Sequence, residues 1–368
     1  MHRLIARMPI NKRFMNTNDD FKPFRQALAT WYQSNKRDLP WRHTTDPYII
    51  WISEIILQQT QVVQGLGYFN RFIERFPNVK SLAEAPLDEV LKLWQGLGYY
   101  SRARNLHASA QQIMTQFHGE FPTEHAQVLS LKGIGEYTAA AICSFAYQQP
   151  FATIDGNVYR VLARYFGIDT PIDSTEGKKL FSVLATELLN PEHPDMHNQA
   201  MMEFGALQCT PSSPNCDACP LQNSCIAFNH KRIAELPKKV GKTSVRGRYF
   251  NYIFVHLDTK TYLHQRGPKD IWQGLYEFPL IETTQATNVE ELLKSEPFQK
   301  LTDGQSFTIL GTSPTKKHVL SHQHIFAQCI HIQLDKKATA LNQYTEIDLK
   351  NLHDYPTSRL MESFLKLK

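Results

Sequence analysis

The stretch LKGIGEYTAAAICSFAY, residues 131–147, decides the fold of the N-terminal part of this chain. Its two glycines, Gly133 and Gly135, flank one apolar residue and precede an alanine-rich run that is typical of a helix. Glycines allow the backbone to approach a ligand closely, and the N–H groups that open a helix bind anions. The stretch therefore predicts a helix, a glycine turn and a second helix, with a nucleic-acid phosphate as ligand. A lone Gly-Ile-Gly also occurs in helical turns that bind nothing.

Two carboxylates lie in contexts that suit acid chemistry. Asp155 follows the glycine turn, in TIDGNVYRVLARYFG, where a further helix begins. An Asp at that place is also a common helix N-cap. Glu54 lies in PYIIWISEIILQQTQV, among Ile and Trp side chains that raise the pKa of a carboxyl group toward neutrality, as a general acid requires. The alternative for Glu54 is the solvent-facing side of a helix, so neither residue alone defines a site.

Four of the six cysteines fall within CTPSSPNCDACPLQNSC, separated by six, two and five residues. They are Cys209, Cys216, Cys219 and Cys225. Disulfides fit poorly with a chain of 368 residues that has no secretory segment near its start. Zinc sites usually have two Cys-x-x-Cys pairs, whereas this stretch has one. An iron–sulfur cluster is wider than one ion and suits cysteines along one loop, so the spacing favours a cluster over zinc.

Length and patterning divide the chain into two domains, and its 42% hydrophobic and 20% charged residues are ordinary for globular protein. Residues 21–230 carry helical periodicity and predict an all-α domain. Residues 231–248 are basic and marked by Pro and Gly, which predicts a linker. Short alternating runs in residues 249–368 predict a smaller α+β domain. Residues 1–20 are expected to form a disordered extension.

The charge and the apolar runs limit the partners of the chain. A net charge of +5 fits a polyanionic partner. No apolar run has the length of a membrane span, so we expect no membrane partner. We also expect a monomer, located in the cytoplasm and associated with the nucleoid if the source is bacterial.

Together these motifs resemble the helix–hairpin–helix DNA glycosylases, and within them the adenine DNA glycosylases of MutY type. The similar blocks follow the order of that family between residues 39 and 225: LPWR, WISEIILQQTQV, GLGYYSRARNLH, LKGIGEYTAAAI, DGNVYRVLAR and NQAMMEFGALQCTP. DIWQGLYEFP and VLSHQHI resemble its Nudix-like recognition domain. The resemblance implies one 4Fe-4S cluster, held by the four cysteines of residues 209–225.

The resemblance also implies an activity. The enzyme flips adenine, paired with 8-oxoguanine or guanine, out of double-stranded DNA and hydrolyses its N-glycosidic bond, leaving an abasic site for base excision repair. Glu54 is the expected general acid, Asp155 the stabiliser of the sugar cation, and Tyr137 and Asn157 orient Asp155 and the water. Relatives of endonuclease III type have a nucleophilic lysine at the position of Tyr137, so we expect a monofunctional enzyme. The alternatives are such a bifunctional lyase, or a non-catalytic iron–sulfur protein that binds DNA.

Further positions match DNA-contacting positions of the family. Gln59 and Tyr99 enter the duplex, Arg42 and Gln199 contact adenine, Gly133 and Gly135 bind phosphate, and Ser321 and His322 contact the oxidised guanine. Leu320 stands where the family usually has Phe. It keeps apolar bulk but loses a stacking face, which puts the strength of lesion discrimination in doubt.

Overall fold

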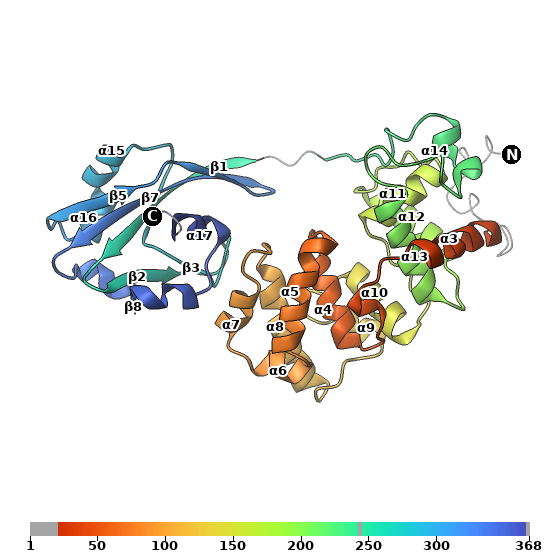
Figure 1. Cartoon of the computed structure of the whole chain (residues 1–368), viewed down its shortest axis with the longest axis horizontal. Coiled ribbons are helices and arrows are strands. Elements are labelled where there is room, and N and C mark those ends of the chain that lie inside the picture. The colour runs from red at the N-terminus through yellow and green to blue at the C-terminus, as the bar shows by residue number, and fades with distance from the viewer. Residues whose placement is uncertain (1–20, 242–244, 366–368) are drawn as a thin grey trace. The chain divides into compact units, whose positions relative to one another are not determined.

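The computed structural model describes residues 21–241 and 245–365 (Figure 1). The predicted extension, residues 1–20, lies outside the described residues. Helices make up the chain as far as α14, and strands begin with β1 at Arg246. The predicted fold class, an all-α part followed by an α+β part, is confirmed.

The helical part comes first. Its elements are α3 (Lys22–Asn35), η1 (Pro40–Arg42), α4 (Pro47–Leu57), α5 (Val62–Arg75), α6 (Val79–Glu84), α7 (Leu87–Leu93), α8 (Ser101–Gln116), α9 (His125–Leu129), α10 (Glu136–Tyr147), α11 (Gly156–Tyr165), α12 (Thr175–Leu188), α13 (Pro194–Leu207), η2 (Gln222–Ser224) and α14 (Ile226–Asn229).

Local sequence signals account for several helix ends. Asp46 caps α4 by accepting the Tyr48 N–H, and Pro47 occupies the first turn, where a missing N–H costs nothing. Helix α10 begins at Gly135, which offers no capping side chain, so its first N–H groups remain open to a ligand. The same helix ends at Gln148, whose left-handed φ of 53° stops the helical hydrogen bonding.

The described chain packs into two compact units that do not follow chain order. The first comprises residues 21–62, 76–80 and 109–241, and the second comprises residues 63–75, 81–108 and 245–365. Part of the helical sequence therefore packs with the strands. The boundary predicted at residues 231–248 stays a prediction.

In the first unit, α4 packs against α10, and α13 packs against α3, α10 and α11. An apolar cluster of this unit contains Phe181 and Phe204, and Cys209, Cys219 and Cys225 pack against it. The cysteine loop is therefore fastened to the core that supports α11 and α13.

The second unit contains two sheets. Its elements are β1 (Arg246–His256), β2 (Lys260–Gln265), β3 (Tyr276–Glu277), β4 (Leu280–Thr283), α15 (Val289–Lys294), α16 (Glu296–Leu301), β5 (Phe307–Thr312), β6 (Lys316–Val319), β7 (Gln323–Leu334), η3 (Thr339–Gln343), β8 (Thr345–Asp348), η4 (Leu349–Asp354) and α17 (Arg359–Leu365). The larger sheet has the order β4-β1-β7-β5, with β6 also on β7, and the smaller has the order β3-β2-β8.

Strands β1 and β7 lie side by side at the centre of the larger sheet (Figure 1). They are parallel, with Arg246 opposite Gln323. Strands β6 and β7 are antiparallel, with Val319 opposite His324, so residues 320–322 form a hairpin turn at the start of β7. This turn carries the recognition residues expected from the sequence, Ser321 and His322.

Candidate active site

Glu54 is buried in the first unit, on α4. Its side chain points among apolar residues and is 6% exposed. The Tyr137 hydroxyl, from α10, donates a hydrogen bond to Glu54 Oε2 at 2.7 Å. Burial raises the pKa of Glu54 to about 7, although the hydrogen bond from Tyr137 favours the ionised form; the charge of Asp155 adds to the rise. A carboxyl group with this pKa can donate a proton at neutral pH.

Asp155 caps the N-terminus of α11. Its Oδ1 accepts the Val158 N–H at 2.8 Å, and its Oδ2 accepts the Asn157 side-chain N–H at 2.7 Å. Burial raises the pKa of Asp155, and these hydrogen bonds oppose the rise. The charge of Asp155 contributes to the raised pKa of Glu54, so the two carboxylates lie within range of an electrostatic interaction. Two carboxylates near one another are the arrangement that glycosidases use.

Tyr137 and Asn157 are both expected from the sequence to orient Asp155. Asn157 does contact Asp155, but the Tyr137 hydroxyl donates to Glu54 instead, and also lies 3.8 Å from Met202 Sδ. The charges of Glu54 and Asp155 both contribute to raising the pKa of Tyr137, after burial, but only Glu54 accepts its hydrogen bond. The hydrogen bond of Tyr137 therefore acts directly on the carboxyl group whose pKa is near neutral.

Arg160, which the sequence analysis missed, links Asn157 to the cysteine loop. Its Nη2 donates to Asn157 Oδ1 at 2.8 Å and to the Gly205 carbonyl at 2.6 Å, and its Nε donates to the Cys209 carbonyl at 2.7 Å. Arg160 lies on α11, three residues after Asn157, so both residues are on one side of the helix. Nothing in the sequence signalled this role, because the other two partners of Arg160, Gly205 and Cys209, are 45 and 49 residues away along the chain.

The four cysteines have free thiols and lie partly buried. Arg164, also on α11, donates to Cys209 Sγ at 3.5 Å and to the Thr210 carbonyl at 2.7 Å. Burial raises the pKa of Cys219 to about 11, and the charges of the other three cysteines of the loop add to the rise. Within residues 21–241 and 245–365, no three His, Cys, Asp or Glu side chains converge closely enough for a single metal ion.

This donor set fits an iron–sulfur cluster. Four thiols on one loop are the ligands that such clusters take, and an N–H donor aimed at a sulfur stabilises a negatively charged ligand. The mutual repulsion of the four thiolates is relieved when iron binds them.

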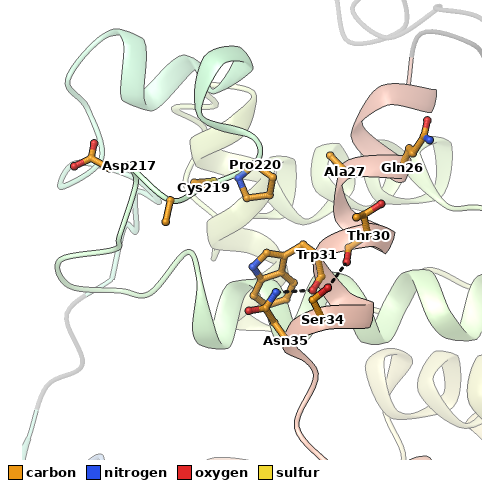
Figure 2. A pocket seen from close by; sticks show the side chains of 10 residues that line it. Gln26, Ala27, Thr30, Trp31, Ser34, Asn35, Asp217, Cys219 and Pro220 are labelled. Carbon is orange, nitrogen blue, oxygen red and sulfur yellow. Dashed lines mark hydrogen bonds between the residues drawn. The ribbon is translucent and has the colours of Figure 1, made fainter.

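A cavity of about 520 Å³ lies between α3 and the cysteine loop (Figure 2). Thr30 and Trp31 line one side, and Asp217, Cys219 and Pro220 line the other. Neither Glu54 nor Asp155 lines this cavity, so it is separate from the paired carboxylates.

Arg42 and Gln199 are both held by neighbours in the first unit. Arg42 forms a double hydrogen bond with Glu203, at 2.9 and 2.8 Å. Glu203 also binds Arg37; burial alone would raise the pKa of Glu203, but the two arginines bring it to about 2. Gln199 accepts the Tyr32 hydroxyl at 3.0 Å. The sequence analysis also missed Glu203. The apolar neighbours Met202 and Phe204 were a signal that this carboxylate is buried and therefore paired.

Gly133 and Gln59 have left-handed backbone conformations. Gly133 has φ of 76°, which a residue with a side chain rarely adopts, so the turn requires glycine there. A Cβ on Gly135 would point into open space, which leaves room for a ligand at the start of α10. Gln59 is exposed, with φ of 55°, just after α4 ends. Such strained, exposed residues are frequent at functional sites.

Tyr99 and Ser321 meet in the second unit. Tyr99 is 49% exposed, has φ of 47°, and its hydroxyl lies 2.7 Å from Ser321 Oγ. His322 is exposed, whereas Leu320 is half-buried and packs against the apolar cluster of this unit. Leu320 therefore anchors the turn, and Ser321 and His322 are the residues left open to a ligand.

Three family models match this chain. Residues 52–186 match the HhH-GPD superfamily of base excision DNA repair proteins, and residues 251–367 match the NUDIX domain. Residues 209–225 match the iron-sulfur binding domain of endonuclease III. The predicted 4Fe-4S cluster is confirmed by this match together with the four cysteines. The fold and the site thus define a helix–hairpin–helix base excision DNA repair protein with a cluster loop and a Nudix-like domain.

Individual relatives narrow the family. An adenine DNA glycosylase of Buchnera aphidicola subsp. Schizaphis graminum is 36% identical over 355 residues, which cover 93% of this chain and 98% of the relative. One from Buchnera aphidicola subsp. Acyrthosiphon pisum is 40% identical over 259 residues, covering 70% of this chain and 73% of the relative. The chain belongs to the adenine DNA glycosylase family.

Solved structures agree on the fold. A thermostable thymine-DNA glycosylase has a TM-score of 0.54 at 29% identity and covers 58% of this chain and 98% of its own. A trapped covalent intermediate of endonuclease III with DNA has a TM-score of 0.51 at 22% identity, over 59% of this chain and 99% of its own, which shows the fold alone. None of the described helices combines the length and apolar character that crossing a membrane requires.

Proposed function

We propose that this chain excises adenine opposite 8-oxoguanine or guanine in double-stranded DNA by hydrolysing the N-glycosidic bond. The observation that carries the proposal is Glu54, a buried carboxyl group with a pKa of about 7, electrostatically coupled to Asp155. Family membership supports adenine as the base and DNA as the partner.

Glu54 supplies the proton that adenine needs in order to leave. Because its pKa is about 7, a large fraction of Glu54 is protonated at neutral pH. Tyr137 donates to Oε2, so the transferable proton of the neutral acid is held on Oε1. Water is excluded around α4, which strengthens the interaction between the acid and the base nitrogen.

Asp155 stabilises the positive charge that develops on the sugar as the bond breaks. Asn157 and the Val158 N–H fix both of its oxygens, so the carboxylate needs no reorganisation during the reaction. These two hydrogen bonds favour the ionised form against burial. Glu54 and Asp155 thus take different roles, acid and anion, because their hydrogen-bond partners differ in number.

Other parts of the first unit support DNA binding. The open N–H groups after Gly135 suit a backbone phosphate. Gln59 is exposed on a strained turn, as a residue that enters a duplex must be. A bound 4Fe-4S cluster would hold the four cysteines of the loop together. Its role would be structural, because a hydrolysis involves no electron transfer. Arg160 and Arg164 fasten that loop to α11.

The identity of the opposite base is read in the second unit. Tyr99 and Ser321 lie in contact and His322 is exposed beside them, which gives one aromatic ring and two hydrogen-bonding groups at one surface. An oxidised guanine differs from guanine by a carbonyl and an N–H, groups that such side chains recognise. This supports 8-oxoguanine as the preferred partner of adenine.

Tyr137 supports a monofunctional enzyme. Its phenol cannot form an imine with the sugar, and its hydroxyl is already engaged with Glu54. We expect an abasic site as the product, without strand cleavage, and we expect the chain to act as a monomer.

A labelled duplex with one 8-oxoguanine·adenine pair tests the proposal. Wild type and Glu54→Gln are incubated with it, and the products are separated with and without alkali. A break at adenine that requires alkali, and that Glu54→Gln does not give, is expected. A break without alkali would replace the proposal by the lyase alternative, and no product from cluster-loaded wild type would refute it.

A further inference from the structure

Three hydrogen bonds, within the turn and to strand β1, hold the hairpin turn between β6 and β7. The Leu320 N–H donates to the Gln323 carbonyl at 2.8 Å, and the Arg246 N–H donates to the His322 carbonyl at 3.2 Å. The third bond uses side chains only: Arg248 Nη1 donates to Gln323 Oε1 at 3.3 Å. The first two need no particular side chain. Residue identity can therefore act on the turn through the third bond, and also through the contact between Tyr99 and Ser321 already described.

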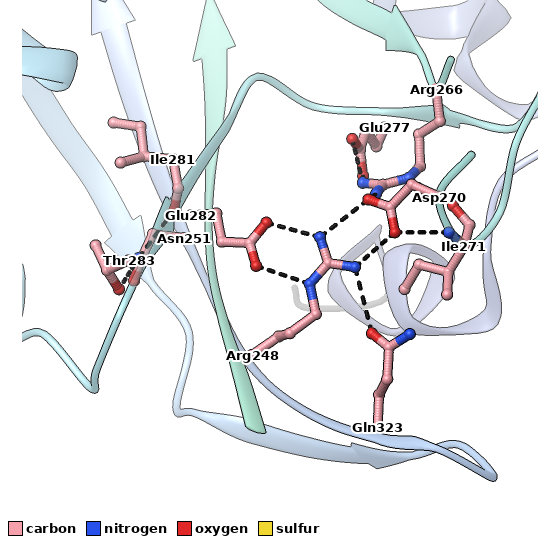
Figure 3. A network of polar contacts seen from close by, with 10 residues as sticks. All are labelled: Arg248, Asn251, Arg266, Asp270, Ile271, Glu277, Ile281, Glu282, Thr283 and Gln323. Atoms are coloured by element: carbon pink, nitrogen blue, oxygen red, sulfur yellow. Dashed lines mark hydrogen bonds and ion pairs between the residues drawn. The ribbon is translucent and has the colours of Figure 1, made fainter. Parts of the chain in front are cut away.

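Arg248 is unusually well fixed (Figure 3). Its guanidinium makes a double hydrogen bond to Glu282, with both distances 2.7 Å. It donates two further hydrogen bonds to Asp270, at 2.6 and 2.9 Å. The hydrogen bond to Gln323 is the fifth. A guanidinium has five N–H donors, so every donor of Arg248 is used.

Asp270 is itself held by Arg266, which pairs with Glu277. Arg266 binds Asp270, and it donates to both Glu277 oxygens at 2.7 and 2.8 Å and to the Ile271 carbonyl at 2.8 Å. Arg266 and Glu277 are buried, so this pair belongs to the interior of the second unit. Burial favours the neutral acid, but the hydrogen bonds and charges of the two arginines hold the pKa of Asp270 at about 2. Asp270 is therefore ionised throughout the neutral pH range.

These contacts form a continuous path from the interior to the turn. Two double ion pairs prevent the Arg248 guanidinium from rotating, because rotation would break at least two charge-assisted bonds. Gln323 Oε1 is consequently held at a fixed point, and Ser321 and His322 directly precede Gln323 in the turn. A lysine could not replace Arg248, since an ammonium is a single point charge without the planar fork.

We propose that Arg248 is a positioning residue that acts through Gln323 to fix Ser321 and His322, and so sets the preference for 8-oxoguanine over guanine opposite adenine. The inference rests on the proposed function. Arg248 does not touch the substrate in this scheme. Its contribution lies in keeping the hydrogen-bonding groups of the turn in one geometry, which discriminates two bases that differ by few atoms.

Gln323→Met is the sharpest test, because it removes the acceptor but leaves all four bonds from Arg248 to Asp270 and Glu282. The rate of adenine release is measured under single-turnover conditions on 8-oxoguanine·adenine and guanine·adenine duplexes. We expect the ratio of the two rates to fall about five- to tenfold, the effect of one lost hydrogen bond. Gln323→Glu keeps an acceptor oxygen and should retain the ratio. Glu346→Gln, which breaks the ion pairs with Lys260 and Lys337 in the same unit, is the control.

Arg248→Lys gives an independent variant, and the double variant with Gln323→Met closes a cycle. Both single variants should lower the ratio, and the double variant should lower it no further, because both act through one bond. An unchanged ratio in Gln323→Met, or an equal loss on both duplexes, would overturn the inference while the proposed function stands. Absence of adenine release by wild type would instead overturn the proposed function. Melting temperatures within a few degrees of wild type identify variants that fold.

Discussion

Tyr137→Phe tests how the active site sets the pKa of its acid. The substitution removes one oxygen and with it the 2.7 Å hydrogen bond to Glu54 Oε2. That bond favours the ionised carboxylate, so its loss raises the pKa of Glu54 further above about 7. A hydrogen bond to a charged group contributes about 1.5 to 3 kcal/mol, and one pKa unit corresponds to 1.36 kcal/mol. We therefore expect a rise of about one to two units.

The assay follows adenine release from an 8-oxoguanine·adenine duplex between pH 5 and pH 9.5, with enzyme below its dissociation constant. Such rates report the pKa values of the free enzyme. For wild type we expect the rate to fall with a midpoint near 7, as Glu54 ionises. Tyr137→Phe should move this midpoint to higher pH. At pH 8 the variant should therefore retain a larger fraction of its maximal rate than wild type retains of its own. Tyr147→Phe is the control, because Tyr147 lies on the same helix and its hydroxyl donates to the Phe121 carbonyl instead. A midpoint that stays in place or falls would refute this account of Glu54.

Three further predictions follow from the first unit. Glu54→Gln should change the pH dependence of stability: a pKa raised from 4.5 to about 7 stabilises wild type fully below pH 4.5, and this contribution of about 3 kcal/mol is lost as the pH rises through 7. The free energy of unfolding of the variant, measured in urea and taken relative to that of wild type, should therefore be higher at pH 8 than at pH 5. The same difference between the two proteins at both pH values would contradict the raised pKa. Arg160→Lys should slow adenine release about tenfold or more and lower the iron content of the protein. The reason is that one ammonium group cannot form hydrogen bonds to Asn157, Gly205 and Cys209 together. An unchanged iron content and rate would show that these hydrogen bonds are dispensable. Gly133→Ala should destabilise the fold by about 1 kcal/mol because φ is 76°, whereas Gly135→Ala, with φ of −103° and open space at Cβ, should not, as thermal melting of the two variants will show.

Short-range patterns predicted the elements and the two carboxylates. Glu54 was a candidate because its neighbours along one helix are apolar. The solvent-facing side of that helix was the alternative, and the structure buries the residue instead. Asp155 is an N-cap, as the alternative for that residue states. The hydrogen bonds that cap α11 also favour the ionised form of its carboxylate, against burial, which raises its pKa.

Long-range partnerships were beyond what the sequence could provide. Glu203 pairs with Arg42 across 161 residues, and Tyr99 meets Ser321 across 222. Periodicity reports which face of a helix is buried, but it does not identify the charged group that lies opposite. The packing of residues 63–75 and 81–108 in the second unit has the same origin, since nothing local to these helices distinguishes one core from another.

Helix α11 connects the two kinds of chemistry in the first unit. Asp155 stands at its N-terminus, and Arg160 and Arg164 on its buried side hold the loop of the four cysteines. Glu54, in contrast, lies on α4, and burial is the largest cause of its raised pKa. Disturbance of the cysteine loop should therefore act on the position of Asp155 more than on the proton affinity of Glu54. It should lower the rate of adenine release at every pH and leave the midpoint near 7. If Asp155 acts as proposed, the cluster matters to the hydrolysis because the loop of its four cysteines is bonded to the helix that carries Asp155.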